Sequence, residues 1–287
     1  MAIALLHASA RLSPSFSVHP STVIGIIGLA VLYERGSKGW GRAARDGAPQ
    51  DARPSTLQHV WYYVALLVMF FSLNGWLHDL SDGFLFSAHM VQHIMITLVV
   101  PPIMIMATPG GMLRPALAIP GVAPVARFIT KPVHAFAIFI VTFAGWHLPP
   151  LYNYALEHHP VHIVEHLMFM VSSVLMWWPV LSPMPELPRL SYPGQMLYLF
   201  LLSIPMSIVS VYITYADTLL YPFYATAPRV WGITPMNDQL IGGLIMWIPG
   251  GLFFYGIISV IFFRWQQRDG VETQAGAQVD YALTTAK

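Results

Sequence analysis

The chain has 287 residues, of which only 9% are charged and 56% are hydrophobic, and its formal net charge is +1. Soluble domains carry about 25% charged residues, so this composition excludes an ordinary water-soluble globule. The near-neutral charge argues against a nucleic-acid partner. The chain has no cysteine, which excludes disulfides, thiolate metal sites and thiol nucleophiles, but it has 12 histidines and 15 methionines.

Seven mainly apolar segments follow one another along the chain, each approaching the length that spans a bilayer as a helix. They cover residues 19–34, 57–76, 84–107, 132–147, 161–181, 195–214 and 238–263. Their apolar runs are continuous, without the alternation of membrane β-strands, and backbone groups in lipid must pair within their own segment. We therefore predict an all-α polytopic membrane protein, a seven-transmembrane-helix bundle embedded in the lipid bilayer.

The two ends of the chain differ from the segments between them. Residues 1–18 begin with the apolar stretch MAIALLHASA, which lacks the positive start of a signal peptide, so we expect a retained outer tail. Residues 264–287 are polar with few apolar anchors, so we expect a disordered cytoplasmic tail. The predicted transmembrane domain between them covers residues 19–263.

Basic residues lie almost entirely in alternate connections between the segments. Twelve of the fourteen lysines and arginines follow the first, third, fifth and seventh segments. These twelve are Arg35, Lys38, Arg42, Arg45, Arg53, Arg114, Arg127, Lys131, Arg189, Arg264, Arg268 and Lys287. Because basic residues accumulate in cytoplasmic loops, we predict an N-terminus outside and a C-terminus in the cytoplasm.

Histidines show the reverse distribution, since ten of the twelve fall on the predicted outer half. Two pairs share one spacing: His89 and His93 in SAHMVQH, and His162 and His166 in HIVEH. Residues four apart on a helix have Cβ atoms about 5–6 Å apart on one face, which suits a shared metal ion. The alternative is that these are structural histidines making hydrogen bonds between helices.

Other side chains extend this candidate metal site on the periplasmic side. His78 and His147 each follow a tryptophan at a predicted outer helix end, where they are either further ligands or interfacial residues. Met246 lies eight residues into the last segment, and imidazole with thioether and no thiol suits monovalent copper. Glu165 is expected to orient a ligating imidazole. Asp238 is either a second such residue or a helix cap.

Three sequence blocks resemble a known family. They are WLHD with SAHMVQHIMI and PPIMIMATPG, then GWHLPPLYNYAL with HIVEHLMFM, and finally DQLIGGLIMWIPGG. In this order, across residues 57–263, they resemble the CtaG-type assembly factors of bacterial caa-type cytochrome c oxidase. The resemblance implies a plasma-membrane protein that aids oxidase maturation and handles copper, with oxidase subunits and a periplasmic copper donor as partners. The positions that match its polar blocks are His78, His89, His93, His147, His162, His166, Asp238 and Met246.

Two other functions remain open at this stage. HIVEH fits the His-x-x-Glu-His pattern of inverted zinc peptidases, and a seven-helix zinc hydrolase could use Ser87 or Asp79 beside the metal. Alternatively, His93 and His166 on facing helices could ligate a haem. Copper transport is less supported, because the inner half offers only two histidines and scattered methionines. The expected function is therefore a non-enzymatic oxidase assembly factor that binds copper.

Overall fold

A computed structural model describes residues 16–39 and 53–285, and every regular element in these ranges is helical. The predicted all-α class is therefore confirmed. The elements in chain order are α2 (Pro20–Ser37), α4 (Thr56–Leu73), α5 (Gly75–Gly83), α6 (Phe86–Ile94), the π-helical turn η2 (Met95–Val99), α7 (Val100–Ala107), α8 (Gly110–Leu117), α9 (Val122–Ile129), α10 (Pro132–Trp146), α11 (Pro149–Glu157), α12 (His159–Leu181), α13 (Tyr192–Thr214), the 3-10 turn η3 (Pro222–Ala225) and α14 (Pro235–Thr285).

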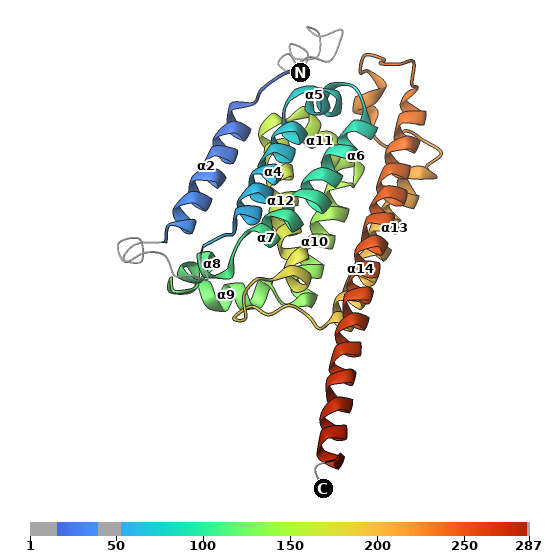
Figure 1. Cartoon of the computed structure of the whole chain (residues 1–287). Helices are drawn as coiled ribbons and strands as arrows, with labels where there is room; N and C mark the ends of the chain where they lie inside the picture. The colour runs from blue at the N-terminus through green and yellow to red at the C-terminus, as the bar shows by residue number, and fades with distance from the viewer. Residues whose placement is uncertain (1–15, 40–52, 286–287) are drawn as a thin grey trace.

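Most of the long helices run side by side as one bundle (Figure 1). Within the described residues, five helical stretches are long and apolar enough to cross a membrane, which makes this a membrane protein. A sixth is counted if α9 and α10, bent by 75° to each other, form one span. Each of the seven predicted segments coincides with a helix, but α2 does not count as a span. Its apolar run is shortened by Glu34 and Arg35.

The structure differs from the sequence prediction at two places. The second span continues past residue 76 to Gly83, with a break at Asn74, whose backbone is extended between two helical stretches. The last helix does not end near residue 263 but continues to Thr285, where disorder was expected. This tail contains no proline and is rich in glutamine and alanine, which favour helix. In Figure 1 it projects well beyond the bundle.

The third span changes its helical pitch directly after His93. Residues Met95–Val99 form a π-helical turn, and the two prolines that follow, Pro101 and Pro102, lack the N–H groups of a regular helix. In an α-helix, Pro101 would leave the carbonyl of Thr97 unpaired. The Trp177 indole N–H of α12 donates to that carbonyl at 3.0 Å. This bond ties α12 to the third span one turn away from His93, and π-turns are frequent at functional sites.

Two glycines let α14 pack closely against its neighbours. A Cβ on Gly242 would collide with the Phe86 ring of α6, and one on Gly243 would collide with the Thr214 hydroxyl of α13. The motif LIGGLIM therefore places the start of α14 directly beside the start of α6, which carries His89 and His93. The core around these contacts is largely aromatic, with Phe86, Phe169 and Trp177 almost fully buried.

Candidate metal centre

The two predicted histidine pairs face each other across the interface between α6 and α12. His89 and His93 have ring centroids 4.2 Å apart, and those of His162 and His166 are 4.3 Å apart. Between the helices, His89 lies 5.4 Å from His162, and His93 lies 5.8 Å from His166. All four side chains are buried, with His89 at 0% exposure. The predicted convergence of the two pairs is therefore present in the structure.

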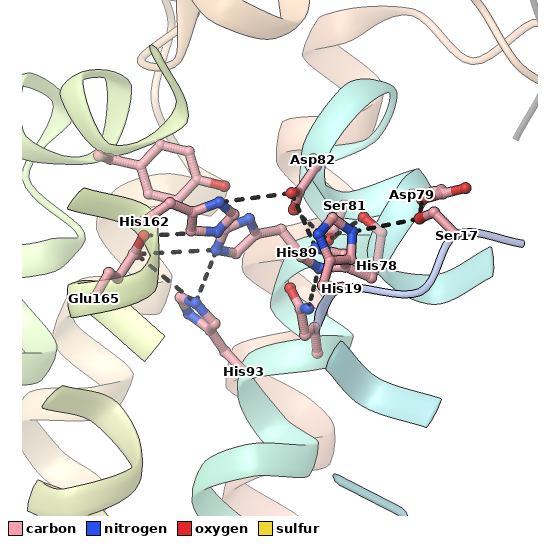
Figure 2. Close-up of polar contacts among 12 residues, drawn as sticks. Ser17, His19, His78, Asp79, Ser81, Asp82, His89, His93, His162 and Glu165 are labelled. Atoms are coloured by element: carbon pink, nitrogen blue, oxygen red, sulfur yellow. Dashed lines mark hydrogen bonds and ion pairs between the residues drawn. The ribbon is translucent and has the colours of Figure 1, made fainter. Parts of the chain in front are cut away.

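Glu165 lies beside three of these histidines, His89, His93 and His162 (Figure 2). One carboxylate oxygen is 3.9 Å from His89 Nε2 and 3.8 Å from His93 Nε2, and the other is 3.9 Å from His162 Nε2. The side chain is fully buried, and neither oxygen accepts a hydrogen bond. These distances are too long for direct hydrogen bonds but leave room for a small cation between carboxylate and imidazoles. We call His89, His93, His162, Glu165 and His166 the carboxylate–histidine cluster.

The cluster contains an unusual concentration of buried polar atoms without a hydrogen-bond partner. Among the described residues these include His89 Nδ1, His93 Nδ1, His162 Nε2, His166 Nε2 and both oxygens of Glu165. Each unpaired buried group costs about 1–3 kcal/mol. Hydrogen bonds between helices therefore leave much of the cluster unsatisfied, and a bound cation would take up the lone pairs of the Glu165 oxygens and of His162 Nε2 or His166 Nε2. The donor set, imidazole nitrogen with carboxylate oxygen, fits a metal ion.

Two overlapping sets of atoms are close enough to share one ion. The first comprises His89, His93 and His166, whose ligand atoms all lie within 4.8 Å of one another. In it, His89 Nε2 and His93 Nε2 form a hydrogen bond of 2.8 Å, and this separation is also close to the distance of about 3 Å between two nitrogens that bind one ion at about 2.0–2.1 Å. The second set comprises Asp82, His89 and His162. His89 belongs to both sets.

Asp82 was not identified from the sequence. It ends α5, where its Oδ2 atom lies 3.2 Å from His78 Nε2 and 3.6 Å from His162 Nδ1. The only local signal is its spacing of four residues after His78, and Asp79 is an equally plausible acid by position. Figure 2 shows Asp82 between His162 and His78, and its side chain is 28% exposed.

His78 is buried beside the cluster, but both of its ring nitrogens are engaged. The Gln92 amide N–H donates to Nδ1 at 2.9 Å and also to the Ser72 carbonyl at 2.8 Å. The Nε2 atom faces Asp82. Because Nδ1 accepts, Nε2 carries the proton, so this arrangement presents no unshared lone pair of His78 to a metal. It orients Asp82 instead.

Asp238 acts on the cluster indirectly, through helix α6. Its carboxylate accepts the backbone N–H groups of Phe86 at 2.6 Å and Ser87 at 3.0 Å, and also the Ser87 hydroxyl. The first N–H groups of a helix have no partner within it, and α6 has no side-chain cap of its own. Asp238 is therefore a helix cap, but of α6 rather than of its own helix α14, whose start the sequence had suggested.

His147 and Met246, both predicted ligands, lie at a separate cavity. This cavity is also lined by His93, whose ring centroid is 5.8 Å from that of His147. His147 donates from Nδ1 to the Phe143 carbonyl at 2.6 Å, and its Nε2 is buried without a partner. One imidazole, His93, thus stands between the carboxylate–histidine cluster and this second group of donors.

The segment before α2 covers one side of α5. His19 places its ring 4.3 Å from that of His78, its backbone N–H donates to Asn74, and Ser17 donates to Asp79 (Figure 2). The sequence had given His19 little weight. His7, considered with it, lies outside the described residues.

Comparisons with known proteins identify the family. The model for "Cytochrome c oxidase caa3 assembly factor (Caa3_CtaG)" matches residues 32–268. Uncharacterized proteins of Mycobacterium bovis and Mycobacterium leprae are 24% and 21% identical over 201 residues, 64% of this chain. The match spans 30% of the length of each relative. No solved structure matches. The family match covers the cluster and most of the bundle, and the chain belongs to the cytochrome c oxidase caa3 assembly factor family.

Proposed function

We propose that this chain assists the maturation of a cytochrome c oxidase by holding a metal ion, copper, in the carboxylate–histidine cluster. His89, His93 and His166 would bind the ion, with Glu165 as a further ligand or as the charge that orients and compensates it. His162 and Asp82 form the adjoining set that shares His89. Copper is the cargo in this proposal, and the partners are oxidase subunits in the same membrane and a periplasmic copper donor.

The observation that carries the proposal is the Glu165 carboxylate, which has no hydrogen bond and lies among buried imidazoles. A buried carboxylate with no hydrogen bond, within 3.9 Å of three histidine nitrogens, is costly unless something positive lies between them. Imidazole with carboxylate suits copper or zinc better than magnesium or calcium. The family's connection with an oxidase favours copper between these two.

The distribution of charge supports a site that faces the outside of the cell. The described basic residues Arg114, Arg127 and Lys131 lie in or beside α8 and α9, at the end of the bundle away from α5 and α11 (Figure 1). The cluster lies toward the α5 end. By the positive-inside rule, the end with α8 and α9 is cytoplasmic, the described N-terminus is external, and α2 completes seven spans. The membrane is then the bacterial inner membrane.

The structure gives less support to the hydrolase and haem alternatives. The two residues nominated to act beside a catalytic zinc are engaged elsewhere: Ser87 donates to Asp238, and Asp79 accepts from Ser17. For haem, the pair suggested by the sequence, His93 and His166, has ring centroids 5.8 Å apart. His89 and Glu165 lie against His93 and occupy space beside its ring that a macrocycle would need. Both alternatives are outcomes of the experiment below.

The test is elemental analysis with optical spectra on the purified full chain, after supply of copper and zinc. The variant His89→Ala/His93→Ala removes two cluster imidazoles, and His59→Ala/His134→Ala removes two histidines outside the cluster. We expect copper in the wild type and the control and less copper per chain in the cluster variant, with circular dichroism confirming its fold. Glu165→Gln provides a second variant if the double alanine fails to fold.

Three results would contradict the proposal. They are equal copper in both double variants, a Soret absorption band, or zinc with hydrolytic turnover. The cellular readout is the copper content of the oxidase in cells that lack this gene and are complemented with each variant. The proposal requires that the cluster variant fail to restore the copper that the control restores.

A further inference from the structure

A small cavity lies beside the carboxylate–histidine cluster, where α6, the end of α10, α13 and α14 meet. Its volume is about 20 Å³, enough for one water-sized species. The side chains that matter for its chemistry are Met90, His93, His147, Met206, Met246 and the backbone of Gly250. No aspartate or glutamate lines it, which distinguishes this thioether pocket from the neighbouring cluster.

His147 lines this pocket and has one nitrogen lone pair without a hydrogen-bond partner. The Phe143 carbonyl can only accept a hydrogen bond, so the contact at 2.6 Å fixes the proton of His147 on Nδ1. The Nε2 atom is therefore the acceptor, and it is buried with no partner in a side chain that is only 3% exposed. The Tyr221 hydroxyl donates to the His147 carbonyl at 2.9 Å, which holds this residue at the end of α10.

Three methionines from three helices border the same space. Met90 comes from α6, Met206 from α13 and Met246 from α14. Methionine in a bundle is ordinarily packing filler that closes gaps. In this structure, however, the three methionines do not fill the space between their helices, because the cavity remains beside them. Gly250 is buried at its edge, and a Cβ added there would meet no atom within 4 Å. The pocket is thus not closely packed. It brings polarizable sulfur atoms together with an imidazole that has no hydrogen-bond partner on one nitrogen.

We infer that the thioether pocket is a second metal site, selective for a soft monovalent cation such as Cu⁺, with His147 Nε2 and the thioethers of Met206 and Met246 as its donors. Soft thioether ligands select monovalent copper, and a pocket without a carboxylate accommodates one positive charge more readily than two. The cluster with Glu165 suits a divalent ion, and His93 forms the wall between the two sites. This inference concerns different atoms from the proposed function, so either can fail without the other.

The test uses two probe ions on the purified full chain in chloride-free buffer. Silver(I) probes the thioether pocket, because it is soft and does not change its oxidation state, and zinc probes the cluster. Met206→Leu/Met246→Leu keeps apolar volume but removes both sulfurs. The matched control, Met168→Leu/Met236→Leu, changes two methionines that are 42% and 36% exposed outside the pocket. Titration calorimetry and metal content after desalting measure both ions.

We expect the pocket variant to weaken silver binding at least about tenfold, the scale of losing supporting interactions at a metal site, and to leave zinc binding unchanged. Gly250→Val, which fills the cavity without removing a donor, should also weaken silver binding. Glu165→Gln should weaken zinc binding only. Equal silver affinity in the pocket and control variants would overturn the inference. Loss of both ions in Glu165→Gln would also overturn it, because there would then be one site rather than two.

Discussion

Histidines lie at both ends of the bundle, but their surroundings differ. His59 lies 3.4 Å from Glu34, and both side chains are about one third exposed. His134 contacts the Phe128 carbonyl at 2.7 Å on a partly exposed surface. His89, by contrast, is fully buried against other imidazoles, and its Nδ1 has no partner. All of these residues are histidines. The cluster histidines differ from His59 and His134 because they are buried and have ring nitrogens without hydrogen-bond partners.

The glutamates repeat this comparison. Glu186 forms an exposed ion pair with Arg114 at 2.7 Å. A hydrogen bond from its own backbone, and then the one from Arg114, lower the pKa of Glu186. Glu165 is buried, with three histidines near it and no hydrogen bond. The exposed Glu186 carboxylate is already paired with Arg114. The buried Glu165 carboxylate needs a positively charged partner to offset the cost of its burial. The predictions below address this contrast.

Metal supply should have the largest effect on stability. If the ion binds only the folded chain, an excess of about 100 times Kd adds about 2.7 kcal/mol to the free energy of unfolding. We expect the melting temperature of the wild type to rise with copper and to fall again with a chelator. His59→Ala should behave in the same way. A melting temperature that does not respond to either treatment would argue against a structural metal site.

The second-largest effect is expected on metal affinity, when the negative charge of Glu165 is removed. Glu165→Gln keeps the shape of the side chain, and we expect it to reduce metal affinity about 10–100-fold, the range for partners that orient metal ligands. Glu186→Gln serves as the matched control, because it alters an exposed carboxylate outside the cluster. Competition against a chromophoric chelator measures both. Equal affinities in the two variants would remove Glu165 from the site.

Two helix caps allow a test of whether Asp238 positions the histidines of α6. Asp238→Ala removes the cap of α6, and Ser55→Ala removes the cap of α4, where Ser55 and Gln58 form a capping box. Each should lower the free energy of unfolding by about 1 kcal/mol. Only Asp238→Ala should also weaken metal binding, because α6 carries His89 and His93. If both variants bind metal like the wild type, Asp238 stabilises the fold without positioning the ligands.

The smallest effect is expected at Arg114 and Glu186. Because the pKa of Glu186 is lowered in the folded chain, its contribution to stability is present above its unfolded value of 4.5 and is lost as the pH falls through the folded pKa. The melting temperatures of wild type and Glu186→Gln should therefore converge in acid and in high salt. A difference that persists under both conditions would show that the pair is not a simple surface interaction.

Local sequence patterns predicted the parts of the site that lie on one helix. The four-residue spacings of His89–His93 and His162–His166 give each pair one face, and HIVEH places Glu165 between two histidines of the cluster. We predicted that the two pairs converge because most histidines lie on the outer half of the chain, which indicated a common site. The helix boundaries were predicted less well, since the break at Asn74 and the helical tail to Thr285 depend on contacts or on weak propensities.

Contacts between distant segments could not be predicted in this way. Asp238 caps α6 from a position about 150 residues further along the chain, and Asp82 meets His162 from another helix. The sequence predicted how far Met246 lies from the outer end of its helix. This position does not determine which neighbouring helix its side chain faces. Met246 consequently borders the thioether pocket with His147, instead of the carboxylate–histidine cluster.

The most direct test of the central claim is an X-ray absorption spectrum of the metal bound to the purified chain. The account predicts a shell of imidazole nitrogens at about 2.0 Å in the wild type, and its loss in His89→Ala/His93→Ala. Identical spectra from the two proteins, or a wild type that retains no metal when copper is supplied, would contradict it.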